Sequence, residues 1–80
     1  MSYTVLYFAR YRELLGVGKE VVTGEFASVD ALREFLILRG DREILGEKGL
    51  MCARNQEMCA LSEPLFDGDE VAFFPTVTGG

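Results

Sequence analysis

One segment of this 80-residue chain carries helix signals at both of its ends, and this segment limits the folds open to the rest. Ser28 is a residue type that caps helix N-termini, and Asp30 places a negative charge in the first turn. Apolar residues recur at helical spacing after Ser28, and Gly40 is a natural residue to end the helix. The pattern predicts one amphipathic helix over residues 29–39. A chain with a single such helix must bury its apolar face against a sheet.

The other segments are typical of short β-strands, rich in β-branched and aromatic residues and separated by turn residues. The predicted strands are residues 3–9, 19–26, 50–54, 57–61 and 70–74. Residues 10–15 favour a short helical turn, and residues 41–49 a connector with one turn at most. Asn55 and Gln56 have the spacing of a hairpin turn. The element order predicts an α+β roll, in which one helix crosses one face of a single sheet.

The composition excludes several classes of function. The chain has no histidine, which removes Ser–His and Cys–His catalysis and histidine-ligated zinc. Eight Lys and Arg residues against thirteen Asp and Glu residues give a net charge of −5, so we expect no nucleic-acid partner.

Cys52 and Cys59 form no CxxC motif, and we expect them to be packing residues with reduced thiols. A disulfide between them is conceivable only if the chain is secreted. The N-terminus shows no signal-peptide pattern, and no apolar run approaches the ~20 residues that span a bilayer. We therefore expect a cytoplasmic protein with no membrane partner.

A cluster of carboxylates at Asp67, Asp69 and Glu70 has two interpretations, a metal site or a solvated turn. The cluster lacks the further ligands of an EF-hand loop. We therefore expect a solvated turn and no bound metal.

The chain ends in Gly79-Gly80, and we divide it into a domain over residues 1–75 and a flexible tail over residues 76–80. A frayed terminus is the structural explanation. The functional explanation is that glycines, which lack Cβ, can enter a channel too narrow for other residues. The α-carboxylate of Gly80 could then be activated as an adenylate and converted into a thiocarboxylate by other enzymes.

The chain resembles a known family over essentially its whole length, including a mid-chain hairpin at Asn55-Gln56. Residues 67–75 (DGDEVAFFP) and the ending Val77-Thr78-Gly79-Gly80 resemble the C-terminus of the small, sulfur-carrying subunit of molybdopterin synthase. Residues 5–9 and 12–14 are similar to that family's first strand and the turn after it. One departure is Thr76, where the family usually has a second proline.

The resemblance implies a ubiquitin-like β-grasp fold, with a mixed sheet of about five strands and one main helix on one face. It implies that an E1-like enzyme uses ATP to adenylate Gly80 and that a sulfur donor protein converts the adenylate into a thiocarboxylate. The carrier then docks on the large synthase subunit, in a heterotetramer, and gives its sulfur to cyclic pyranopterin monophosphate to form the dithiolene. The chain itself would be non-catalytic and hold no permanent cofactor.

The residues and the resemblance together give a set of site residues. Strand alternation places Val5, Tyr7, Val71 and Phe73 under the helix, and it leaves Leu6, Phe8 and Phe74 on the far face. The resemblance implies that Phe8, Met58 and Phe74 contact the large subunit, with Arg12 as a further candidate; the alternative for the three apolar residues is an ordinary place in the core. It also implies that Thr78 and Gly79 form the tail behind the reacting Gly80.

Three rival functions remain open at this stage. The chain could carry sulfur for thiamine or another thio-product, or it could be a protein modifier joined to lysines through Gly80. It could also be a plain β-grasp binding domain whose terminal glycines are incidental.

Overall fold

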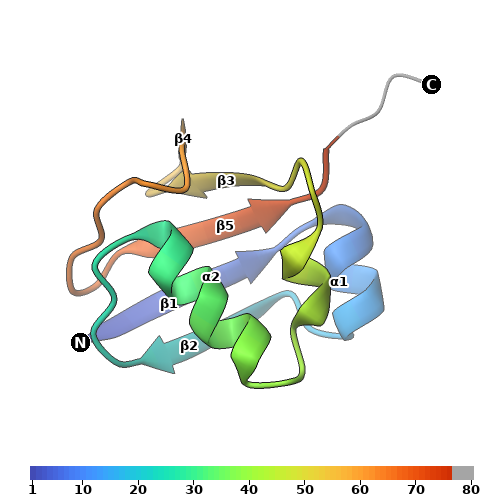
Figure 1. Ribbon diagram of the computed structural model, residues 1–80, viewed down its shortest axis with the longest axis horizontal. Coiled ribbons are helices and arrows are strands. Elements are labelled where there is room, and N and C mark those ends of the chain that lie inside the picture. Colours follow the sequence, from blue (N-terminus) through green and yellow to red (C-terminus); the bar gives the residue numbers. More distant parts are fainter. Residues whose placement is uncertain (77–80) are drawn as a thin grey trace.

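The computed structural model describes residues 1–76 of the chain (Figure 1). Within them lie five strands, two α-helices and a 3₁₀-helix. In chain order these are β1 (Ser2–Tyr7), α1 (Ala9–Leu15), β2 (Lys19–Thr23), α2 (Val29–Leu38), η1 (Glu43–Gly46), β3 (Met51–Arg54), β4 (Glu57–Cys59) and β5 (Glu70–Phe74).

The five strands form one mixed sheet in the order β2-β1-β5-β3-β4. The central pair, β1 and β5, is parallel, and the other neighbouring pairs are antiparallel. Helix α2 crosses one face of this sheet, and α1 lies at the edge where β5 ends (Figure 1). This arrangement confirms the predicted α+β fold with one main helix on one face.

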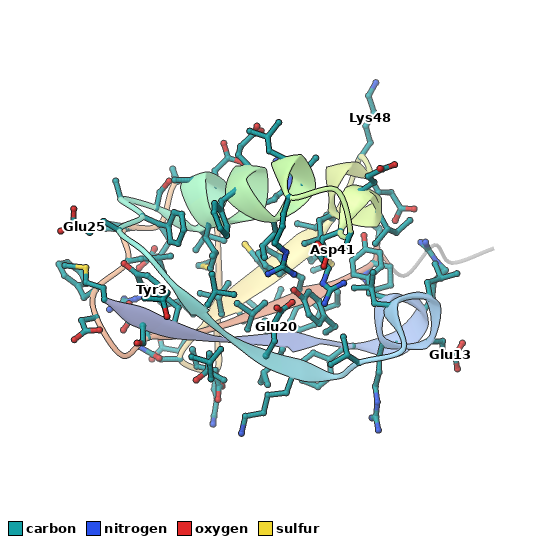
Figure 2. The ribbon with its side chains drawn as sticks, turned by 90° about the horizontal axis from the view of Figure 1, so that it is seen from below. Tyr3, Glu13, Glu20, Glu25, Asp41 and Lys48 are labelled. Carbon is teal, nitrogen blue, oxygen red and sulfur yellow. The ribbon has the colours of Figure 1, made fainter. Side chains whose placement is uncertain are left out.

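The core lies between α2 and the sheet, as the view along the layers shows (Figure 2). The side chains predicted to lie under the helix are all buried: Val5, Tyr7, Val71 and Phe73. Leu32 and Leu36 of α2 pack against them. Residues at alternate positions of a strand face the same side, so the pairing of β1 with β5 gathers these side chains in one layer.

Helix α2 has the predicted N-cap, because the Ser28 hydroxyl accepts a hydrogen bond from the backbone N–H of Ala31 at 3.2 Å. The helix ends at Leu38, one residue earlier than predicted, and Gly40 follows with a φ of +97°. Ile37, on the side away from the main apolar stripe, is half-buried because η1 folds back over the helix and Gly46 lies beside it.

Several predicted strands are shorter in the structure. The first strand ends at Tyr7, because α1 begins at Ala9, and the second ends at Thr23, before Gly24 with its φ of +153°. The fourth strand has three residues and ends at Cys59. The predicted hairpin turn is present, with φ of +48° at Asn55 and +71° at Gln56.

The edge strand β2 is fastened to the far end of α2 by a polar cluster. The Tyr7 hydroxyl donates a hydrogen bond of 2.5 Å to the Glu20 carboxylate, and Arg42 donates another of 2.9 Å. Arg39 adds a third contact at 3.1 Å. Glu20 of β2 points towards the helical layer, in which Asp41 lies (Figure 2). Within residues 1–76, neither helix is long and apolar enough to cross a membrane.

Candidate functional site

The face of the sheet opposite α2 carries an apolar surface beside the end of β5. We call this surface the far-face patch. It consists of Leu6, Phe8, Ala53, Met58, Ala72 and Phe74. The rings of Phe8 and Phe74 lie 5.6 Å apart between centroids and are tilted by 42°. Four segments of the chain therefore contribute to one surface, because β1, β5, β3 and β4 are neighbours in the sheet.

The far-face patch is concave, with a hollow of about 380 Å³. Its floor is made by Ala53 and Ala72, which are opposite each other in the register of β3 and β5. Larger side chains form the walls, and two of them remain open to solvent: Phe8 is 42% exposed and Met58 is 57% exposed. A concave apolar surface with exposed aromatic and methionine side chains has the character of a protein-binding site.

The hairpin that carries Met58 is clamped to β5 by Asn55. The backbone N–H of Asn55 donates to the Glu70 carbonyl at 2.8 Å, and the side-chain oxygen accepts from the Glu70 N–H at 2.9 Å. The side-chain amide donates to Asp69 at 3.0 Å. Asn55 therefore does more than form the predicted turn, since it sets the position of Met58 relative to Phe74.

The predicted solvated turn at Asp67, Asp69 and Glu70 is wrong for Asp69, which is buried, whereas Asp67 is exposed. Asp69 is only 7% exposed, and its carboxylate accepts hydrogen bonds from Arg54 Nε at 2.8 Å and from the Phe66 N–H at 2.8 Å. Burial by itself would raise the pKa of Asp69, but the bonds from Arg54, the Phe66 N–H and Asn55 outweigh it and hold the pKa below its ordinary value. The sequence could not show this, because Asn55 and Arg54 are 14 and 15 residues away, in the β3–β4 hairpin.

No group of three or more His, Cys, Asp or Glu residues is placed to hold a metal ion in the part of the chain that the structure describes. Asp67 instead accepts a hydrogen bond from the Ser2 N–H at 2.8 Å.

The chain leaves the sheet from β5, directly next to the far-face patch (Figure 1). Thr76, the residue that departs from the family pattern, donates a hydrogen bond from its hydroxyl to the Gly49 carbonyl. Gly49 has a φ of +82°, and a Cβ there would meet the Thr76 hydroxyl oxygen. The contact between these two residues therefore requires glycine at position 49. The predicted tail residues Thr78, Gly79 and Gly80 lie outside the described residues.

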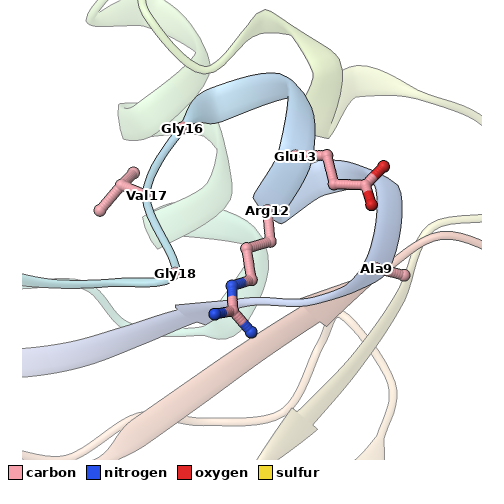
Figure 3. Close-up of a pocket in the computed structure, with 6 residues that line it drawn as sticks. All are labelled: Ala9, Arg12, Glu13, Gly16, Val17 and Gly18. Carbon is pink, nitrogen blue, oxygen red and sulfur yellow. The ribbon is translucent and has the colours of Figure 1, made fainter.

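Arg12 lies apart from the far-face patch. It lines a second hollow, of about 520 Å³, between α1 and the loop that leads into β2 (Figure 3). Its side chain packs over Gly18, where an added Cβ would meet Nε at 3.3 Å, whereas Glu13 points to another side (Figure 3). The Arg12 carbonyl accepts the hydrogen bond of the Gly16 N–H that ends α1, at 3.0 Å.

The structure thus places Phe8, Met58 and Phe74 on one surface and Arg12 in a separate place, and their contact with a partner stays a prediction. The alanine floor was not predicted. The signal that could have identified it is the alternation of β3 and β5, which puts Ala53 and Ala72 on the same face as Phe74.

Comparisons with known proteins agree with this geometry. The family model described as "ThiS family" matches residues 5–80. The molybdopterin synthase sulfur carrier subunit of Escherichia coli (strain K12) is 49% identical over 78 residues, which cover 95% of this chain and 96% of that protein.

Two solved structures share the fold. SAMP1 from Haloferax volcanii has a TM-score of 0.79 and 31% identity, with full coverage of both chains. A complex of subunits 1 and 2 of the molybdopterin-converting factor from Helicobacter pylori contains a chain with a TM-score of 0.68 and 27% identity, also with full coverage of both chains. These neighbours are ubiquitin-like β-grasp proteins, which confirms the predicted fold family. The chain therefore belongs to the ThiS family, among the relatives of the molybdopterin synthase sulfur carrier subunits.

Proposed function

We propose that this chain carries sulfur for the biosynthesis of the molybdenum cofactor, as a thiocarboxylate on Gly80. The observation that carries the proposal is the 49% identity, over nearly the whole of both chains, to a protein named for that role. The proposed place of action is the cytoplasm, where thiols are kept reduced.

The position of the far-face patch supports a docking step. Phe74 is the last residue of β5, so a partner that covers the patch also lies next to the start of the tail. Six residues, 75–80, reach at most roughly 20 Å when fully extended. We propose that the large subunit of molybdopterin synthase covers the patch, in a heterotetramer, and receives the tail in its own active site. The Helicobacter pylori complex of subunits 1 and 2 supports a partner of this kind.

The chemistry needs no catalytic side chain in this protein. An E1-like enzyme joins the Gly80 carboxylate to AMP from ATP, releasing pyrophosphate. The sulfur of a donor protein's persulfide then attacks the carbonyl carbon, and AMP leaves. Two electrons from a thiol cleave the bond to the donor and leave the thiocarboxylate, whose sulfur is given to cyclic pyranopterin monophosphate. The enzymes supply the acid–base groups, which is compatible with a chain that has no histidine.

The first experiment measures charging, which here means conversion of the Gly80 carboxylate into a thiocarboxylate. The protein is incubated with ATP, an E1-like adenylating enzyme and a sulfur donor, and its intact mass is recorded. We expect a gain equal to the difference between a sulfur and an oxygen atom, with no gain in a variant that lacks Gly80. An unchanged mass, under conditions that charge the Escherichia coli relative, would show that the chain is not a sulfur carrier.

The second experiment measures docking on the large subunit by titration calorimetry. Phe74→Ala should weaken binding by about 2 kcal/mol or more, since aromatic residues at the centre of interfaces contribute most of the affinity. Phe66→Ala is the matched control, because Phe66 is more exposed, at 60%, and lies outside the patch. Equal losses for the two variants would remove the far-face patch from the docking model. Arg12→Ala tests the second hollow in the same assay.

A second candidate function is a protein modifier. The observation that favours it is the likeness to SAMP1, a small archaeal modifier protein, which is 31% identical to this chain. In the charging experiment this function would give a different product, an isopeptide bond between Gly80 and a lysine of another protein.

A further inference from the structure

Two thiols that the proposed function does not use face each other across strands β3 and β4. Cys52 and Cys59 are direct partners in the antiparallel register, and both are free. Their Sγ atoms are 3.8 Å apart. The side chains therefore already lie on the same face of the sheet, in contact with each other.

The two thiols differ in access. Cys52 is 2% exposed and belongs to the core under α2. Cys59 is half-buried on the edge strand β4 and lines a small hollow of about 220 Å³ together with Met58 and Glu63. Cys59 is therefore the thiol more open to a small reagent from solvent, and Cys52 lies behind the surface.

The backbone spacing suits a covalent bond between them. Directly opposed residues in an antiparallel pair have Cα atoms about 4.5–5.5 Å apart. Disulfides join residues whose Cα atoms are roughly 4.4–6.8 Å apart. The distance between the two Sγ atoms must fall from 3.8 Å to a bond length of about 2 Å. Rotation of the two side chains is enough for this change, and the strands stay in place.

We propose that Cys52 and Cys59 form an oxidation site, in which hydrogen peroxide converts the two thiols, otherwise kept reduced, into a disulfide across β3 and β4 that a thiol reductant reopens. Cys59 attacks one peroxide oxygen, the O–O bond breaks, and Cys59 becomes a sulfenic acid while water leaves. The Cys52 sulfur then attacks the Cys59 sulfur, and the sulfenic hydroxyl leaves as a second water with the Cys52 proton. Two thiols lose two electrons, and one molecule of hydrogen peroxide is reduced to two of water.

The burial of each cysteine determines which thiol reacts with peroxide and which one closes the disulfide. Burial, together with the contact to Cys59, raises the pKa of the Cys52 thiol. Cys52 is also the more buried of the two thiols, at 2% exposure against a half-buried Cys59, so Cys59 is the thiol that meets peroxide first. The position of Cys52 beside Cys59 makes it the resolving thiol.

The bond would fix the strand that carries part of the far-face patch. Strand β4 has three residues at the edge of the sheet, and β3 is its one partner strand within residues 1–76. Met58 lies between Cys59 and the turn, and its side chain faces the other side of the strand. Oxidation would therefore restrain the backbone next to Met58 without altering that side chain.

The test treats the folded protein at low concentration with hydrogen peroxide and measures intact mass and free thiols after denaturation. We expect a loss equal to two hydrogen atoms, no thiol left to alkylate, and full recovery with dithiothreitol. The readout involves neither Gly80 nor a partner, so its failure would leave the proposed carrier function untouched.

Two variants identify the geometry as the cause. Cys59→Ser should show no mass loss, because one thiol cannot close a bond within the chain. The double variant Cys59→Ser, Met58→Cys keeps two cysteines but places the second on the opposite face, and it should also form no internal disulfide. A Cys59 sulfinic acid beside an intact Cys52, a disulfide-linked dimer, or no reaction at all in the unaltered protein would each overturn the proposal.

Discussion

Replacement of Asp69 by alanine is the most direct test of how the candidate site is held together. The carboxylate is nearly buried and accepts bonds from Arg54, Asn55 and the Phe66 N–H, all between 2.8 and 3.0 Å. These bonds join the β3–β4 hairpin and the loop before β5 to one side chain. Their loss should therefore loosen the part of the sheet that carries Met58.

The expected cost follows from the partners that lose their acceptor. Hydrogen bonds to a charged group contribute about 1.5–3 kcal/mol each, and an orphaned part-buried donor costs about 1–3 kcal/mol. Arg54 retains Glu63 as a partner at 3.2 Å, so the main losses are at Asn55 and at the Phe66 N–H. We expect Asp69→Ala to lower the free energy of unfolding by about 3 kcal/mol. A domain of this size has a total of only about 4–12 kcal/mol.

Urea denaturation followed by circular dichroism measures this difference. Asp67→Ala is the matched control, because Asp67 is exposed and accepts one bond, from the Ser2 N–H; its change should stay within about 0.5 kcal/mol. Because the folded-state pKa of Asp69 is lowered, its contribution is fully present above the unfolded pKa of about 3.9 and is lost as pH falls through the folded value. Equal stabilities for the two variants at pH 7 would refute the role of Asp69 in holding the β3–β4 hairpin to the loop before β5.

Three further substitutions test local features of the fold by thermal or chemical unfolding. Gln56→Gly should raise the free energy of unfolding by about 0.5–1 kcal/mol, because glycine adopts the φ of +71° without strain; a loss of stability would contradict this turn geometry. Ser28→Ala should lower it by about 1 kcal/mol through loss of the helix cap, and an unchanged melting temperature would count against the cap. Glu20→Gln should lower it by about 1.5–3 kcal/mol, since Tyr7 and Arg42 lose a charged acceptor; the cluster contributes nothing if the variant unfolds at the same denaturant concentration.

The features predicted well from sequence depend on neighbouring residues. The cap at Ser28, the glycine after the helix and the two-residue turn at Asn55-Gln56 all act within a few positions, so their signals can be seen in the chain itself. The faces of β1 and β5 were also assigned correctly, because side chains alternate along a strand.

The features that were missed depend on residues far apart in the chain. Asp69 lies in a stretch whose composition is typical of a solvated turn. The pairing of β3 with β5 is what brings Arg54 and Asn55 to it. The concave shape of the far-face patch likewise depends on Ala53 and Ala72 being opposite each other across strands. Local propensity carries no information about such pairings, which are set by the packing of the whole sheet.

The parallel pairing of β1 with β5 has a consequence for biosynthesis. The two central strands come from opposite ends of the described chain, so the middle of the sheet cannot close until β5 has left the ribosome. An interrupted translation product, or a chain cut before β5, would lack one of the two central strands of the sheet. Such a chain would be exposed to proteases. Under the proposed function, cells would then not accumulate truncated copies that occupy the partner's binding surface without delivering sulfur.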